Sequence, residues 1–226
     1  MSAITKPVVV LFDVDETLVH TGGSGARSWK VAFDKIYGIP ADIGEHTSAG
    51  ETDPEVARET FKAVVKRDPS DDELDRIYAQ YLLNLSEDIV VSEGYRMLPG
   101  ADQCLARLVE AGVLLGLVSG AMEGAARTKL IPANLNRYFL FGAYGSDSPD
   151  RAELTGLAIE KATRLHAQLT PDQVFVVGDT PRDIDATRKA GAVSVGVGTG
   201  KYSVAELSEA GADHVLSSLA DPFPGM

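Results

Sequence analysis

Six short apolar runs, each followed at once by a glycine, serine or aspartate, constrain the fold of this 226-residue chain more than any other feature. Runs such as VVVLF and VFVV lack the polar and apolar alternation of a half-exposed strand, so they suit strands buried on both faces. Segments of helix length separate them, and buried strands alternating with helices are typical of a doubly wound α/β fold with a parallel sheet. We predict strands at Val8–Phe12, Val113–Val118, Tyr138–Phe141, Val174–Val177, Val193–Val197 and His214–Leu216, with helices at Asp102–Glu110, Ala152–His166, Asp183–Ala190 and Val204–Ala210.

The region from about His20 to Met97 interrupts this alternation. It has amphipathic helical patterns at Ser28–Tyr37, Pro54–Lys66 and Asp71–Leu85 and no convincing strand. We therefore expect a helical insert at residues 20–97 and a core made of residues 1–19 and 98–226. The acidic excess of the chain is concentrated in this insert, which we interpret as the solvated outer faces of its helices.

Composition excludes several classes of protein. Lys and Arg number 21 against 33 Asp and Glu, and the resulting net charge of −12 repels nucleic acid and anionic membranes. Cys104 is the only cysteine, which excludes an intrachain disulfide. No apolar run is long enough for a membrane span or a signal peptide, so we expect a cytoplasmic protein. We expect a monomer or a homodimer, which the sequence does not distinguish. The same charge opposes a small anionic ligand unless local cations or a metal ion offset it.

Acidic residues follow the first predicted strand directly, in the order Asp13-Val14-Asp15-Glu16-Thr17. Open α/β sheets bind ligands beyond the carboxyl ends of their strands. Residues i and i+2 of an extended segment share a face, so Asp13 and Asp15 can point into one site. Two carboxylates that close require a cation, and Mg²⁺ is the usual choice for oxygen ligands beside a phosphate.

Two more predicted strands end in residues suited to the same site. The run Val174–Val177 leads into Asp179 and Asp183, although Asp183 could simply cap the helix that starts there. The run before Ser119-Gly120 delivers a hydroxyl and free backbone N–H groups, which can hold an anion. A Ser-Gly turn alone is common in proteins, and it gains meaning only beside the carboxylates.

Together these segments resemble the motifs of the haloacid dehalogenase-like superfamily, most closely its phosphoglycolate-phosphatase-like branch. The sequence DVDETL resembles the first motif, DxDxT, LGLVSG the second and GDTPRD the fourth, each after a predicted strand. The resemblance implies a Rossmann-like core with an inserted helical cap. Gly50-Glu51-Thr52-Asp53 resembles a cap segment that faces the active site in relatives.

The resemblance also implies roles for single residues. Asp13 would be the nucleophile that forms an aspartyl-phosphate, and Asp15 the general acid and base. Asp13 and Asp179 would hold Mg²⁺ through their side chains, Asp15 through its backbone carbonyl, and Asp183 directly or through water. The substrate-binding set would contain Ser119, Gly120, Arg151 and Thr17, whose donors offset the charge of the phosphoryl oxygens.

The third motif is where the sequence departs from the family, because the usual lysine before the fourth strand is missing. Arg151, just ahead of a predicted helix, is the best replacement, since its planar fork can grip two oxygens. Lys129 is an alternative, whereas Lys161 would lie deep in a helix and face away. The glycine-rich segment Gly196–Lys201 fails the spacing of a phosphate-binding loop, and we interpret it as a flexible loop.

These residues predict a Mg²⁺-dependent phosphatase that acts on a small phosphorylated metabolite. Asp15 disfavours dehalogenase and phosphonate hydrolase activity, because those enzymes of the family lack this acid/base. A sugar-phosphate mutase and a non-catalytic regulatory module remain alternatives. Phosphoglycolate, a sugar phosphate, a nucleoside monophosphate and pyrophosphate all remain open as substrates.

Overall fold

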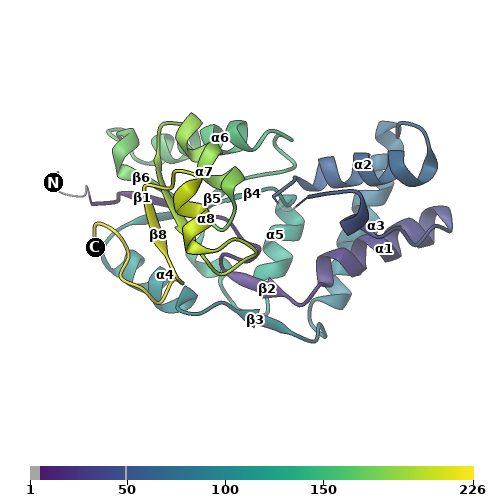
Figure 1. Ribbon diagram of the computed structural model, residues 1–226, viewed down its shortest axis with the longest axis horizontal. Coiled ribbons are helices and arrows are strands. Elements are labelled where there is room, and N and C mark those ends of the chain that lie inside the picture. Colours follow the sequence, from purple (N-terminus) through teal and green to yellow (C-terminus); the bar gives the residue numbers. More distant parts are fainter. Residues whose placement is uncertain (1–5, 49) are drawn as a thin grey trace.

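A parallel sheet forms the centre of the molecule in the computed structural model, which describes residues 6–48 and 50–226 (Figure 1). Six strands of the described chain lie in the order β5-β4-β1-β6-β7-β8, and every neighbouring pair is parallel. Their bounds are β1 Val9–Phe12, β4 Leu114–Ser119, β5 Phe141–Tyr144, β6 Val174–Gly178, β7 Val193–Val197 and β8 His214–Leu216. The predicted doubly wound α/β fold is confirmed.

Helices cover both faces of the sheet because its central strands are apolar on both sides. In β1, Val10 and Phe12 pack with the side of α4, whereas Val9 and Leu11 pack with the side of α6. The helices around the sheet are α4 Ala101–Glu110, α5 Glu123–Leu130, α6 Arg151–Leu165, α7 Pro181–Lys189 and α8 Val204–Glu209. No helix in the described ranges is both long and apolar enough to cross a membrane.

One strand of the core lies three residues later than predicted. The segment Asn136–Tyr138 forms a 3₁₀ helix, and β5 begins only at Phe141. The aromatic run that suggested a strand is used differently, since the Tyr138 hydroxyl donates to Asp102 of α4 and Phe139 packs edge-on against Phe12. Tertiary contacts therefore override the local strand propensity here.

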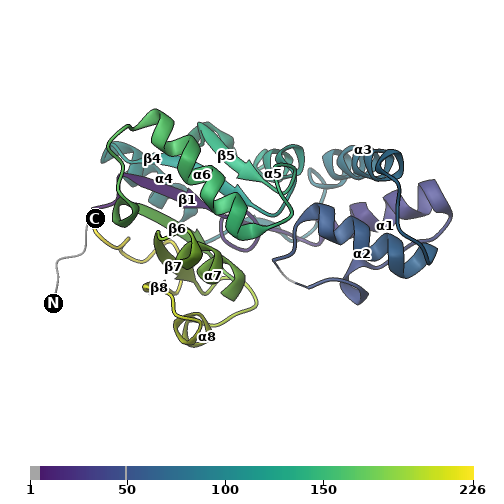
Figure 2. The same cartoon turned by 90° about the horizontal axis from the view of Figure 1, so that it is seen from above.

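The inserted region forms a separate group of helices beyond one end of the sheet (Figures 1 and 2). These are α1 Ser24–Tyr37, α2 Asp53–Val65 and α3 Asp71–Asp88, close to the predicted bounds. Trp29 of α1 stacks on Tyr81 of α3 with ring centroids 3.9 Å apart, and both side chains are buried. We call this group of three helices the cap.

Two short strands between the sheet and the cap were not predicted. β2 Val19–Thr21 and β3 Tyr95–Met97 pair antiparallel to each other, so the expectation of no strand in residues 20–97 was wrong. Three residues are too few to show an alternating pattern, which explains the omission. The predicted boundary after residue 19 falls inside β2, and the division into core and cap stays a prediction. The expectation of no signal peptide was based on the N-terminal segment, which lies largely in residues 1–5, outside the described ranges.

Candidate active site

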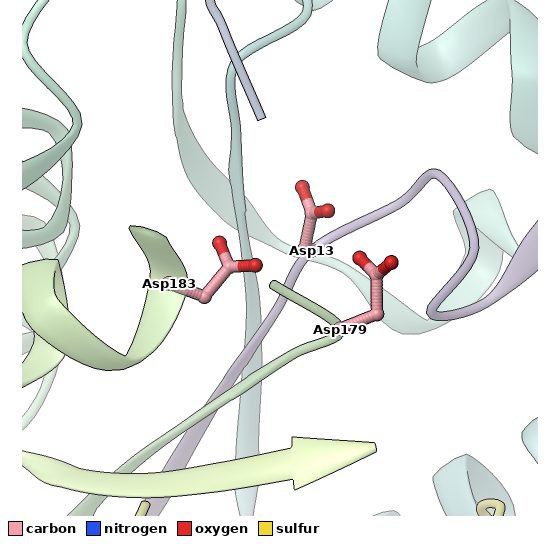
Figure 3. Close-up of side chains that lie close together, drawn as sticks. All are labelled: Asp13, Asp179 and Asp183. Carbon is pink, nitrogen blue, oxygen red and sulfur yellow. The ribbon is translucent and has the colours of Figure 1, made fainter. Parts of the chain in front are cut away.

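Three buried aspartates gather at the carboxyl edge of the sheet (Figure 3). Asp13 follows β1, Asp179 follows the neighbouring β6, and Asp183 lies in the first turn of α7. One carboxylate oxygen from each lies within 4.8 Å of those of the other two. The Asp15 side chain stands outside this group, which leaves only its backbone carbonyl for the predicted metal site.

The electrostatics of this group call for a cation. Burial, with the nearby charges of Asp183 and Asp15, raises the pKa of Asp13 to about 7 although Arg151 opposes the shift. Burial and the same crowding of carboxylates raise the pKa of Asp179 to about 9. Carboxylate oxygens that repel one another out of contact with water are the ligands that suit a hard divalent ion. The donor set therefore fits Mg²⁺.

Asp183 also caps α7, as its position at a helix start suggested. Its Oδ2 accepts hydrogen bonds from the backbone N–H of Thr180 at 3.0 Å and from the Thr180 hydroxyl at 2.7 Å. Its Oδ1 accepts from Arg151 Nε at 2.6 Å. The capping interpretation of this residue is confirmed, whereas its role as a metal ligand stays a prediction. Its oxygens accept more hydrogen bonds than those of Asp13 or Asp179.

Arg151 reaches the site from the first position of α6. Its Nη2 lies 3.0 Å from Asp13 Oδ1, and its side chain is 11% exposed. Burial disfavours the charged guanidinium, but Asp183 and Asp13 more than offset this, so the pKa of Arg151 is raised above its ordinary value. A cation thus stands at the predicted position, beside the predicted nucleophile.

Lys129 also reaches the site, but on a different carboxylate. Its Nζ donates to Asp15 Oδ2 at 2.6 Å from α5, and its side chain is 7% exposed. Burial lowers the pKa of Lys129, but the charges of Asp15, Tyr81 and Asp53 raise it by more than burial lowers it, so the ammonium stays charged. Lys161 instead donates to the Gly142 carbonyl at 2.7 Å, outside the cavity, as expected. Arg151 and Lys129 are therefore two cations with separate partners rather than alternatives for one position.

A cavity of about 200 Å³ opens above these groups. Core residues form most of its wall, and the cap loop before α2 contributes Gly50 and Glu51. The lining residues are Asp13, Asp15, Glu16, Gly50, Glu51, Ser119, Gly120, Ala121, Arg151, Asp179 and Thr180. The three motif segments, Arg151 and the residues Gly50 and Glu51 thus meet around one space.

A sequence model of haloacid dehalogenase-like hydrolases matches residues 8–191 of the chain. The chain belongs to the haloacid dehalogenase-like hydrolase family. It is 30% identical over 225 residues to a phosphoglycolate phosphatase of Rhodospirillum rubrum, covering 95% of this chain and 88% of the relative. It is 24% identical over 217 residues to pyrophosphatase PpaX of Listeria monocytogenes serotype 4b, with 96% and 94% covered. A crystal structure of a predicted phosphoglycolate phosphatase from Haemophilus somnus 129PT shares the fold, with a TM-score of 0.74, 20% identity and 97% of both chains covered.

The turn after β4 joins the core of this haloacid dehalogenase-like hydrolase to its cap. The backbone N–H of Asp53 donates to the Gly120 carbonyl at 2.8 Å, and Asp53 Oδ2 accepts from the N–H of Met122 at 2.8 Å. Burial raises the pKa of Asp53 to about 6, opposed by Lys129 and by the bond from Met122. The N-terminus of α2 is thereby fixed over the Ser-Gly turn.

The predicted substrate-binding residues differ in their access to the cavity. Ser119 and Gly120 line it, and a Cβ on Gly120 would stand 2.9 Å from the backbone oxygen of Glu51, so a larger residue there would displace the loop before α2. Thr17 is fully buried and does not line the cavity. The turn at Glu16, with φ of 56°, carries the chain back into the core at this point, so we withdraw Thr17 from the substrate-binding set.

The glycine-rich segment after β7 is part of this site, which the sequence interpretation missed. The Thr199 hydroxyl donates to the Glu16 carbonyl at 2.5 Å. A Cβ built on Gly200 would overlap the Asp179 carboxylate. The segment is therefore a close-packed wall against a predicted metal ligand rather than a free loop. The signal in the sequence was the run of glycines itself, which permits such close approach.

Proposed function

We propose that this hydrolase is a Mg²⁺-dependent phosphatase that cleaves a small phosphomonoester through an aspartyl-phosphate. The observation that carries the proposal is the position of Asp13, buried between two further carboxylates with the Arg151 guanidinium 3.0 Å from its Oδ1. A nucleophilic carboxylate needs this combination, because its own charge and that of the substrate must both be offset. The names of the relatives, a phosphoglycolate phosphatase and a pyrophosphatase, agree with phosphoryl chemistry.

In the first half-reaction, the Asp13 carboxylate attacks phosphorus, and the bond from phosphorus to the leaving oxygen breaks. Ser119, the backbone N–H of Gly120 and Arg151 hold the phosphoryl oxygens. The carboxyl group of Asp15 protonates the leaving oxygen, and Lys129 Nζ holds that side chain in place from 2.6 Å. Mg²⁺ bound by Asp13, Asp179 and the Asp15 backbone carbonyl, with Asp183 directly or through water, would supply the positive charge that this cluster of acids lacks.

In the second half-reaction, water attacks the phosphorus of the aspartyl-phosphate. The Asp15 carboxylate takes a proton from that water, and phosphate leaves while the Asp13 carboxylate is restored. One carboxyl thus gives and then receives a proton, so Asp15 needs contact with water as well as with the substrate. Its side chain is 42% exposed, in contrast to the three buried aspartates.

The test is phosphate release from a panel of phosphomonoesters with Mg²⁺ and after its removal with a chelator. Asp13→Asn should reduce kcat by orders of magnitude without loss of the fold, whereas Asp68→Asn, the same change at an exposed cap residue, should leave kcat unchanged. A folded enzyme that releases no phosphate from any ester contradicts the proposal. Isomerisation of a sugar phosphate without net release of phosphate would indicate a mutase. Ligand binding and function that are unchanged in Asp13→Asn would indicate a regulatory module.

A further inference from the structure

The wall of the cavity divides into two parts with different chemistry. One part surrounds Asp13 and contains the groups that the proposed function assigns to the phosphoryl group. The other part includes the loop before α2 and is left for the group to which the phosphate is attached. The lining residues that the proposed function leaves unassigned are Glu16, Gly50, Glu51, Ala121 and Thr180, so the two ionisable side chains among them are both acidic.

Glu51 lies directly over the phosphoryl end of the cavity. Its backbone oxygen is 2.9 Å from the position that a Cβ on Gly120 would take. Its side chain is 16% exposed, and Oε1 lies 3.4 Å from Arg182 Nη2. Its Oε2 is buried and has no hydrogen-bond partner among the described residues. A buried carboxylate oxygen without a donor is costly, and it gains most from a donor that a ligand brings.

The cations near the cavity are already committed to other carboxylates. Arg151 contacts Asp13 and Asp183, and Lys129 contacts Asp15. Arg182 approaches Glu51 but does not line the cavity. The side chain of the other acid, Glu16, is paired with His20, whose Nδ1 lies 2.6 Å from Glu16 Oε1. Within the described residues, the cap side of the cavity therefore offers no cation to a second anionic group on the substrate.

We propose that Glu51 selects the leaving group, and that the preferred substrates are small monophosphates whose leaving group carries a hydroxyl or ammonium donor instead of a second negative charge. The donor bonds the Glu51 carboxylate, whereas a carboxylate or a second phosphate at the same place meets a like charge in a buried setting. This inference rests on the proposed phosphatase function and narrows its substrate. It also separates this chain from relatives whose names point to phosphoglycolate and pyrophosphate, both of which carry the second anion.

Three two-carbon esters of nearly equal size isolate the charge of the leaving group. They are 2-phosphoglycolate with a carboxylate, 2-hydroxyethyl phosphate with a hydroxyl and O-phosphoethanolamine with an ammonium. For each ester, kcat/KM and the inhibition of p-nitrophenyl phosphate hydrolysis are measured with Mg²⁺ present. The kcat/KM of phosphoglycolate should be about tenfold or more below that of the other two esters, because repulsion between buried like charges is worth at least that factor. The proposal is overturned if phosphoglycolate is the best substrate of the three, or if none of the three is hydrolysed or acts as an inhibitor.

Variants then assign the preference to Glu51. Glu51→Gln should raise kcat/KM for phosphoglycolate about tenfold and lower it for phosphoethanolamine, because the charge is gone while an acceptor oxygen remains. Glu59→Gln removes the same charge from an exposed position of α2 and should preserve the order. Equal shifts in both variants would attribute the effect to the net charge of the cap and overturn the assignment.

Arg182 provides the sharpest contrast. If Arg182 received a second anion of the substrate, Arg182→Ala would selectively reduce activity on phosphoglycolate, and the proposal would be wrong. If Arg182 only offsets part of the negative charge of Glu51, Arg182→Ala should discriminate against phosphoglycolate more strongly than the wild type does. Failure of the wild type to release phosphate from every ester, p-nitrophenyl phosphate included, contradicts the phosphatase function itself and is distinct from a wrong order among active substrates.

Discussion

The ion pair of Lys129 and Asp15 joins a buried ammonium to a carboxylate that reaches water. Lys129 is 7% exposed and Asp15 is 42% exposed, with 2.6 Å between Nζ and Oδ2. Removing either partner breaks the same contact, but the charge that remains differs. We predict that Lys129→Met costs much less stability than Asp15→Asn.

The magnitudes follow from what each variant leaves behind. At 2.6 Å the gross attraction is about 6 kcal/mol at an effective dielectric constant of about 20. In Lys129→Met the desolvation cost of the ammonium disappears with it, and the Asp15 carboxylate regains water, so we expect a net cost of about 1 kcal/mol. In Asp15→Asn the ammonium stays buried with Asp53 as its remaining nearby acid, and we expect about 3 kcal/mol, the lower end for a broken buried pair.

Urea denaturation in the presence of a chelator measures both costs without a contribution from bound metal. Trp29, the only tryptophan of the chain and buried against Tyr81, reports unfolding of the cap by fluorescence, and far-UV circular dichroism reports the whole molecule. Lys62→Met, at an exposed position of α2, is the matched control for loss of a lysine charge. A cost of Lys129→Met equal to or above that of Asp15→Asn would refute the reasoning.

Three further predictions address the site and its wall. Gly200→Ala should abolish most activity and Mg²⁺ binding, because the added Cβ overlaps the Asp179 carboxylate. The control is Gly156→Ala in α6, where a Cβ meets no atom within 4 Å; it should leave kcat unchanged and add up to about 1 kcal/mol of stability. Lys129→Met should lower kcat/KM about tenfold or more for alkyl phosphates, which need the proton from a well-placed Asp15, but only about twofold for p-nitrophenyl phosphate; equal losses on both would show a general structural defect. Burial raises the folded-state pKa of Asp53 to about 6 from 3.8, so ionisation of Asp53 lowers the free energy of unfolding as pH rises through that window, by about 3 kcal/mol in total. In metal-free denaturation measured from pH 4 to pH 7, Asp53→Asn should lack this decrease, and parallel curves of stability against pH for both proteins would contradict the shift.

The strand-end carboxylates could be predicted because their positions depend on local sequence. An apolar run followed by Asp13 or Asp179 places the acid just beyond a buried strand whatever the rest of the chain does. Parallel strands end at the same edge, so the two acids meet once β1 and β6 are neighbours. Arg151 could be located in a similar way, since it starts the helix that follows β5, another parallel strand of the same sheet.

Residues that depend on packing between distant elements could not be predicted in this way. Lys129 lies 114 residues from Asp15, and a lysine late in a helix is ordinarily exposed. The approach of Gly200 to Asp179 and of Glu51 to Gly120 likewise depends on how a loop or the cap is seated on the core. The β2 and β3 strands, three residues each, exist through their mutual pairing and leave no periodic signal.

The charges of the site also determine which aspartate is the better probe of catalysis. The net charge of −12 suggested an environment hostile to phosphate, but both cations of the site are buried and held there by acids of the motifs. Asp13→Asn leaves Arg151 paired with Asp183 and lowers the repulsion that raises the pKa of Asp179, so this variant should fold at least as well as the wild type. Asp15→Asn deprives Lys129 of its closest partner. A loss of activity in Asp13→Asn therefore reports on the nucleophile and the metal site without a loss of stability, whereas the same loss in Asp15→Asn combines catalysis with stability.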